Sequence, residues 1–128
     1  MKKFITLMAA TVFAASVYAG EFADISTKDV LTAATAKSAV IIDVNGPDSF
    51  KAGHVPSALS FAAIKDNLAA SLPADKNALI IAYCGGPQCG AYLKAAKAAQ
   101  KLGYTNIKHM AAGISGWNEA KLPTEPGK

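Results

Sequence analysis

The chain has 128 residues, which allows one domain of ordinary size, and 52% of them are hydrophobic, which is enough to build a core. The formal net charge is +4, but every basic residue is a lysine and the lysines are scattered, so the charge does not favour a nucleic-acid partner. Two cysteines are too few for a disulfide scaffold.

The N-terminus has the three-part pattern of a secretory signal peptide. Two lysines precede an almost unbroken apolar run from Phe4 to Val17, and Val17 and Ala19 are small enough for a signal peptidase to read. A membrane-spanning helix needs about 20 apolar residues, so the run is short for an anchor, although a retained anchor is the alternative. We expect a signal peptide over residues 1–19, a domain over residues 20–128 with net charge +2, a periplasmic or secreted location, and no membrane attachment after cleavage.

The first half of the domain alternates helical and strand patterns. Residues 26–36 are predicted to form a helix with Ser26 as its N-cap. Residues 39–44 form a continuous, β-branched apolar run that is typical of a buried strand. Turn residues follow, and Asp48 is expected to cap a short helix that ends at Gly53.

The second half continues the alternation. A short strand, a helix and a second buried strand are expected at residues 59–61, 62–71 and 78–83. A helix with one apolar face is predicted over residues 90–101, followed by Gly103 as its C-cap. A strand over residues 106–110 and a short helix over residues 114–120 complete the chain. This order predicts an α/β fold with an open, mostly parallel sheet and helices on both faces.

Cys84 directly follows the second buried strand and opens a Gly-Gly-Pro loop. Ligands of open α/β sheets bind beyond the carboxyl ends of the strands. The loop N–H groups, and the positive end of a helix that begins near Cys89 or Gly90, are expected to surround the Cys84 sulfur and to favour the nucleophilic thiolate. An inert buried cysteine is the alternative. The residues predicted to form this anion cradle are Gly85, Gly86, Pro87, Gln88 and Gly90.

Five segments carry a recognisable order of motifs. They are the strand 40–44 with Asp43, the segment 50–58 around His54, the strand 80–83 that leads to Cys84, and the segments 102–104 and 112–117. In this order and spacing they resemble the rhodanese-like family over nearly all of residues 24–123. The resemblance implies sulfurtransferase chemistry, in which Cys84 attacks a sulfane-sulfur donor, becomes a persulfide and passes the sulfur to a nucleophilic acceptor. It implies a structural, supporting role for His54.

Four further residues are interpreted from their surroundings in the sequence. Asp43 ends a buried strand, so its carboxylate needs partners, which can be loop N–H groups or His54. Tyr83 is expected to point to the face opposite Cys84 and to pack in the core. His109 and Trp117 are likewise expected to be packed residues.

The sequence departs from the family pattern at two positions. The loop arginine that usually stands five residues after the cysteine is replaced by Cys89, and the arginine two residues after the strand aspartate is replaced by Asn45. Arginine binds doubly anionic groups through its planar fork of donors, and the chain contains none. Efficient thiosulfate turnover is therefore not expected, and phosphatase or arsenate-reductase chemistry is disfavoured.

Cys89 has three interpretations. It can be a resolving cysteine that closes a disulfide with Cys84, provided that the two Cα atoms lie within about 7 Å. It can be a small buried residue at a helix start. Zinc binding by both cysteines with His54 and His109 is the third, but the histidines show no ligand spacing, so no metal and no cofactor is predicted.

Three functions follow from these interpretations. The first is a sulfurtransferase or persulfide carrier that acts through Cys84. The second is a thiol–disulfide redox protein that uses Cys84 and Cys89. The third is a non-catalytic interaction module of rhodanese-like fold. The expected partners are a small sulfane-sulfur donor and a thiol or other nucleophilic acceptor, which can be a protein, and neither nucleic acid nor membrane.

Overall fold

The computed structural model describes residues 22–127, so the predicted signal peptide lies outside the described residues. Five parallel strands form one sheet in the order β1-β5-β4-β2-β3. The strands are β1 (Ala23–Asp24), β2 (Ala39–Asp43), β3 (Leu59–Ser60), β4 (Leu79–Tyr83) and β5 (Ile107–His109). The central strand β4 therefore lies between β2 and β5, and its carboxyl end is the start of the Cys84 loop.

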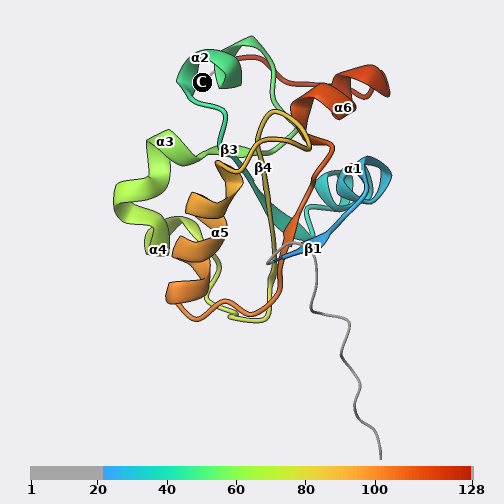
Figure 1. The fold of residues 1–128 in the computed structure, drawn as a ribbon. Coiled ribbons are helices and arrows are strands. Elements are labelled where there is room, and N and C mark those ends of the chain that lie inside the picture. Colours follow the sequence, from blue (N-terminus) through green and yellow to red (C-terminus); the bar gives the residue numbers. More distant parts are fainter. Residues whose placement is uncertain (1–21, 128) are drawn as a thin grey trace, which may run out of the picture.

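Helices cover both faces of this sheet, which confirms the predicted fold class (Figure 1). The helices are α1 (Thr27–Ala36), α2 (Pro47–Ala52), α3 (Phe61–Ile64), the 3-10 helix η2 (Lys65–Asn67), α4 (Leu68–Ser71), α5 (Tyr92–Lys101) and α6 (Gly113–Glu119). In the view of Figure 1, α3, α4 and α5 lie to the left of the strands, and α1 and α6 lie to the right. Among residues 22–127, no helix is both long enough and apolar enough to cross a membrane.

The two faces of the sheet build two separate cores. Because side chains alternate along a strand, Ile80, Ala82 and Cys84 point toward α5, whereas Ile81 and Tyr83 point toward α1 and α6. Tyr83 and Cys84 therefore lie on opposite faces, as predicted. The second core includes Trp117, which is fully buried and donates its indole N–H to the Pro123 carbonyl at 2.7 Å.

Several element boundaries differ from the prediction. Ser26 caps α1 as predicted, by accepting a hydrogen bond from the Asp29 amide. The next helix, α2, is capped by Gly46 rather than by Asp48, because proline is well suited to the first helical position and Pro47 occupies it, which leaves Asp48 in the first turn. Strand β1 was not predicted, because two residues carry no recognisable period.

The predicted helix over residues 62–71 is broken into α3, η2 and α4. The break falls at Asn67, whose φ of −143° and ψ of 44° are not helical. Asparagine favours such departures, since its side chain competes for backbone hydrogen bonds. Phe61, Ile64 and Leu68 still pack against the same core, so the broken segments remain on one face of the sheet.

The helix after the Cys84 loop begins at Tyr92, later than predicted. Cys89 is tied back to Cys84, and Gly90 is a weak helix former, so the chain turns once more before the helix starts. The amides of Leu93 and Lys94 donate to the carbonyls of Gly90 and Ala91 in this turn.

Candidate active site

Cys84 lies at the carboxyl end of β4 and is 1% exposed. The loop that follows it makes a tight turn, in which the Cys89 amide donates to the Gly86 carbonyl at 3.1 Å. Pro87 occupies the second position of this turn, where its fixed φ is favourable. The turn brings the chain back, so that the Cα atoms of Cys84 and Cys89 are 6.3 Å apart and the two sulfurs are joined in a disulfide.

The start of α6 fixes the orientation of the loop backbone. The amides of Ile114 and Ser115 donate to the carbonyls of Cys84 and Gly85 at 2.9 and 3.0 Å. In a trans peptide the next N–H points opposite to the carbonyl, so the N–H groups of Gly85 and Gly86 point away from α6. They are therefore directed toward the side of the sheet on which the Cys84 side chain lies.

Gly113 permits this contact between α6 and the loop. Its φ is +65°, and a Cβ at this position would lie 2.5 Å from the Gly85 carbonyl carbon and from the Gly86 nitrogen. It would also lie 2.7 Å from the Cys84 carbonyl oxygen. No side chain fits there, so only glycine lets α6 approach closely enough to hold the loop. The sequence showed Gly113 as part of a motif but not this role.

The predicted cradle residues contribute unequally. Among residues 22–127, the N–H groups of Gly85, Gly86 and Gln88 donate to no other described residue, so they are available to an anion at the loop. Pro87 has no N–H and shapes the turn instead. The first turn of α5 lies beyond Gly90, so the positive end of the helix is farther along the chain from Cys84 than predicted.

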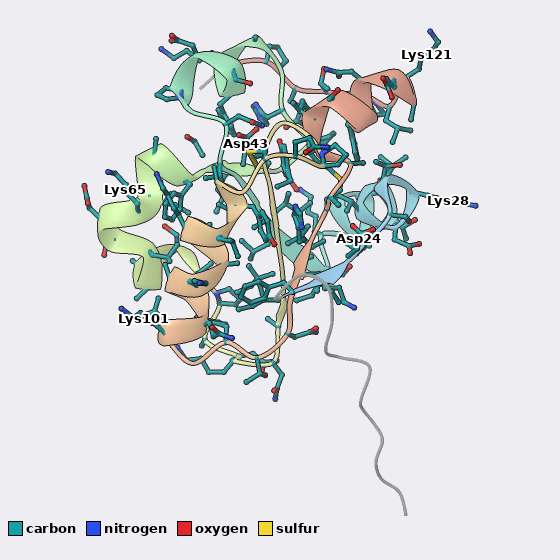
Figure 2. All side chains as sticks on the ribbon, in the orientation of Figure 1. Asp24, Lys28, Asp43, Lys65, Lys101 and Lys121 are labelled. Atoms are coloured by element: carbon teal, nitrogen blue, oxygen red, sulfur yellow. A yellow bond between two sulfur atoms is a disulfide. The ribbon has the colours of Figure 1, made fainter. Side chains whose placement is uncertain are left out.

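Asp43 supports the same end of the sheet from β2, where Figure 2 labels it. Its Oδ2 accepts a hydrogen bond from the Tyr83 hydroxyl at 2.6 Å, and its Oδ1 accepts one from the Asn45 amide at 2.7 Å. The Tyr83 hydroxyl in turn accepts the Val55 amide at 3.1 Å. Burial and the neighbouring carboxylate raise the pKa of Tyr83 far above its usual range, so the phenol stays protonated as a donor.

This network decides between the two partners expected for Asp43, which were loop N–H groups and His54. Asp43 bonds the Asn45 amide and Tyr83, but not His54. Tyr83 packs in the core as predicted, and it also supplies the hydrogen bond that a buried carboxylate needs. Asp43 and Tyr83 are paired at the last positions of two adjacent parallel strands, and this pairing brings their side chains together. Only the sheet register reveals it, so the sequence alone did not indicate this hydrogen bond.

Two further polar residues lie near this end of the sheet: Asn45 is close to the loop, and His109 lies on the α5 side of the sheet. The Asn45 Oδ1 lies 3.7 Å from where a Gly85 Cβ would be, and its Nδ2 is buried without a partner among the described residues. His109 is paired in register with Ala82, stacks on Tyr92 at a ring-centroid distance of 3.4 Å, and has its Nε2 buried without a described partner. Burial lowers the pKa of His109, against the opposing effect of Asp24, so the ring is neutral at neutral pH.

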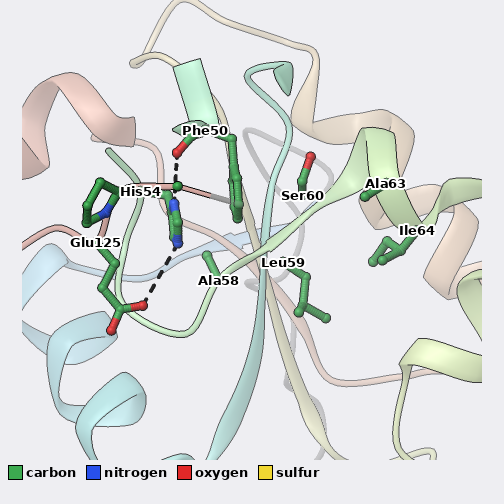
Figure 3. A pocket seen from close by; sticks show the side chains of 10 residues that line it. Phe50, His54, Ala58, Leu59, Ser60, Ala63, Ile64 and Glu125 are labelled. Atoms are coloured by element: carbon green, nitrogen blue, oxygen red, sulfur yellow. Dashed lines mark hydrogen bonds and ion pairs between the residues drawn. The ribbon is translucent and has the colours of Figure 1, made fainter. Parts of the chain in front are cut away.

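His54 lies away from the loop, at an apolar cavity of about 550 Å³ (Figure 3). Its Nδ1 lies 2.8 Å from the Phe50 carbonyl, its ring stacks on Phe50, and its Nε2 lies 3.9 Å from Glu125. These contacts join α2 to the C-terminal segment, as expected of a structural residue. Neither cysteine lines this cavity.

The described residues form no cluster of metal ligands. Residues 22–127 contain no group of three His, Cys, Asp or Glu side chains that could hold a metal ion. Of the four zinc ligands considered from the sequence, the two cysteines are joined to each other, and His54 and His109 lie on different faces of the sheet with different neighbours.

The rhodanese-like domain model matches residues 26–120, and the chain belongs to the rhodanese-like family. Over 105 residues it is 30% identical to an HTH-type transcriptional regulator of Mycobacterium tuberculosis, a match that covers 80% of this chain. The chain spans 45% of the length of that curated relative.

Solved structures share the fold. A protein of Bacillus halodurans has 26% identity and a TM-score of 0.69, with 83% of this chain and 78% of that chain covered. The polysulfide-sulfur transferase homodimer of Wolinella succinogenes has 24% identity and a TM-score of 0.65, with 83% and 80% covered. The fold is thus one that sulfurtransferases use.

Proposed function

We propose that this domain carries sulfane sulfur on Cys84 and transfers it to a nucleophilic acceptor. The observation that carries the proposal is the arrangement at the end of β4, where hydrogen bonds from α6 turn the Gly85 and Gly86 amides toward the side on which Cys84 lies. Donors that converge on a sulfur stabilise both a thiolate and the negative terminal sulfur of a persulfide. The rhodanese-like family and a sulfurtransferase of the same fold support the same chemistry.

The transfer starts from the reduced cysteine pair. The Cys84 thiolate attacks the outer sulfur of a persulfide or polysulfide donor, the S–S bond of the donor breaks, and the rest of the donor leaves as an anion. The product is a Cys84 persulfide. An acceptor thiolate then attacks the terminal sulfur, and the Cys84 thiolate is the leaving group. The two steps consume no external oxidant or reductant.

The donor that we propose is a persulfide or short polysulfide rather than thiosulfate. No cationic side chain occurs between residues 84 and 90, and the chain has no arginine. A sulfonate-bearing dianion needs the bidentate donors that arginine supplies, whereas a single anionic sulfur can be held by backbone N–H groups. The acceptor is a small thiol or a protein thiol.

Thiol–disulfide exchange is the second candidate, because Cys84 and Cys89 already form a disulfide. In that reading the pair passes two electrons to or from a partner thiol, and Cys89 is the resolving cysteine. The predicted export of the protein into an oxidising compartment favours it. N-terminal sequencing of the mature protein, expected to begin at Gly20 or Glu21, tests the export.

Sulfur loading tests the first function. Reduced protein is treated with inorganic polysulfide and desalted, and the Cys84 peptide is expected to gain the mass of one sulfur atom, which cyanide then releases as thiocyanate. Cys89→Ser, which keeps the nucleophile, should load, and Cys84→Ser should not. Failure of both the wild type and Cys89→Ser to retain sulfane sulfur would refute persulfide transfer. Full alkylation of both thiols in protein isolated without reductant would reject the redox function.

A further inference from the structure

A small hollow lies between the β2–α2 connection, α3, η2 and the start of α5, and Ala91 in its lining follows Cys89 by two residues. Its volume is about 220 Å³. Two of its lining residues are cationic, none is acidic, and the others are apolar or glycine; they are Val44, Gly46, Phe61, Ala62, Lys65, Ala91 and Lys94. We call this the lysine hollow. Lys65 projects from the layer of α3, η2 and α4, where Figure 2 labels it.

The two lysines of the hollow are not neutralised. Among the described residues, neither Lys65 nor Lys94 forms an ion pair with a carboxylate. Two cations over an apolar floor favour a ligand with anionic groups on a small apolar body. A ligand with two carboxylates would replace water as the partner of the two ammonium groups, and its carbon skeleton would cover the apolar lining residues Val44 and Phe61.

The lining of the hollow reaches the chain next to the more exposed of the two cysteines, since Ala91 follows Cys89 by two residues. Val44, Phe61 and Ala91 pack against the same core cluster as Cys89. Cys89 is partly exposed, whereas Cys84 is 1% exposed. Because the site of attack on a disulfide depends on access, an incoming thiol reaches Cys89 before Cys84.

We propose that the lysine hollow binds a small anionic thiol, which opens the disulfide by attacking the Cys89 sulfur. This inference rests on the proposed function only at one point: opening the disulfide supplies the reduced Cys84 that sulfur transfer needs. The thiolate forms a new S–S bond with Cys89, the Cys84–Cys89 bond breaks, and its electron pair leaves with Cys84 as a thiolate among the loop N–H groups. A second thiol then attacks the mixed disulfide and releases Cys89 as a thiolate, so that two thiols are oxidised to one disulfide and the pair is reduced.

Reduction kinetics test the binding site. The oxidised protein is reduced with mercaptosuccinate, a thiol with two carboxylates, and with the neutral 2-mercaptoethanol, and the ratio of the two rates is measured. Lys65→Gln with Lys94→Gln should lower that ratio about two- to thirtyfold, the range that two exposed ion pairs supply. Lys28→Gln with Lys101→Gln removes the same charge away from the hollow and should change the ratio by less than about twofold. An equal change in both double variants would overturn the assignment.

Trapping locates the attack. A brief reaction with mercaptosuccinate is quenched with iodoacetamide, and peptide mass analysis should find the mixed disulfide on Cys89 and the alkyl group on Cys84. The reverse pattern would overturn the access argument. Neither measurement requires a persulfide: if the Lys65→Gln with Lys94→Gln variant keeps the wild-type rate ratio while sulfur loading is intact, this inference alone is refuted. Intact selectivity without sulfur loading refutes only the sulfur-transfer function.

Discussion

Replacing Gly113 by alanine should destabilise the domain by displacing the Cys84 loop. The added Cβ would lie 2.5 Å from two backbone atoms of the Gly85–Gly86 peptide, neither of which can rotate away. Overpacking of this kind costs about 1–3 kcal/mol, and the positive φ of +65° adds about 1–2 kcal/mol. We expect the free energy of unfolding to fall by about 2–5 kcal/mol.

Gly103→Ala is the matched control for this prediction. Gly103 also has a positive φ, of +103°, but a Cβ there would meet only the Lys76 side chain, at 3.8 Å. Its substitution should therefore cost only the backbone strain of about 1–2 kcal/mol. Urea unfolding of the oxidised proteins measures both values. Equal losses in the two variants would refute the reasoning, because they would show that contact with the loop adds nothing.

The same substitution has a functional consequence. Displacing the loop weakens the hydrogen bonds from Ile114 and Ser115 that orient the Gly85 and Gly86 amides. Sulfur loading of reduced Gly113→Ala, measured well below its unfolding temperature, should therefore be slower than that of Gly103→Ala. Equal loading rates would show that α6 does not position the loop for chemistry.

Three other outcomes are expected. Tyr83→Phe leaves the buried Asp43 carboxylate without its 2.6 Å donor and should lower the free energy of unfolding by about 1.5–3 kcal/mol; unchanged stability in urea would contradict this role. Burial lowers the pKa of His109, so the unfolded chain binds the proton more tightly, and stability should fall as the pH drops below about 6.5. His109→Gln should show a shallower fall in urea unfolding across that range, and an equal fall would contradict the assignment. Reducing the Cys84–Cys89 bond, which closes a loop of sequence separation 5, should cost about 2 kcal/mol, measured by unfolding with and without a phosphine reductant; Cys89→Ser, whose stability should not respond to the reductant, is the control.

The amino-acid sequence by itself determined the fold class and the position of Cys84 in that fold. The short, β-branched apolar runs at residues 39–44 and 78–83 indicate buried strands, and the turn residues that follow the second run place Cys84 at the carboxyl end of the sheet. These features depend on local periodicity and chain order, which a single sequence carries completely. The same holds for the Ser26 cap, because its hydrogen bond spans only three residues.

Only the tertiary structure decided how the site is held and reached. Gly113 approaches the Cys84 loop from a helix almost thirty residues later, Tyr83 meets Asp43 through the register of two strands, and Lys65 and Lys94 line the same hollow. Each contact joins residues that are distant along the chain, and neither periodicity nor spacing encodes such a distance. The sequence also left open whether Cys89 lies close enough to Cys84 to form a disulfide. The distance of 6.3 Å between their Cα atoms is set by a turn of the chain and not by the number of intervening residues.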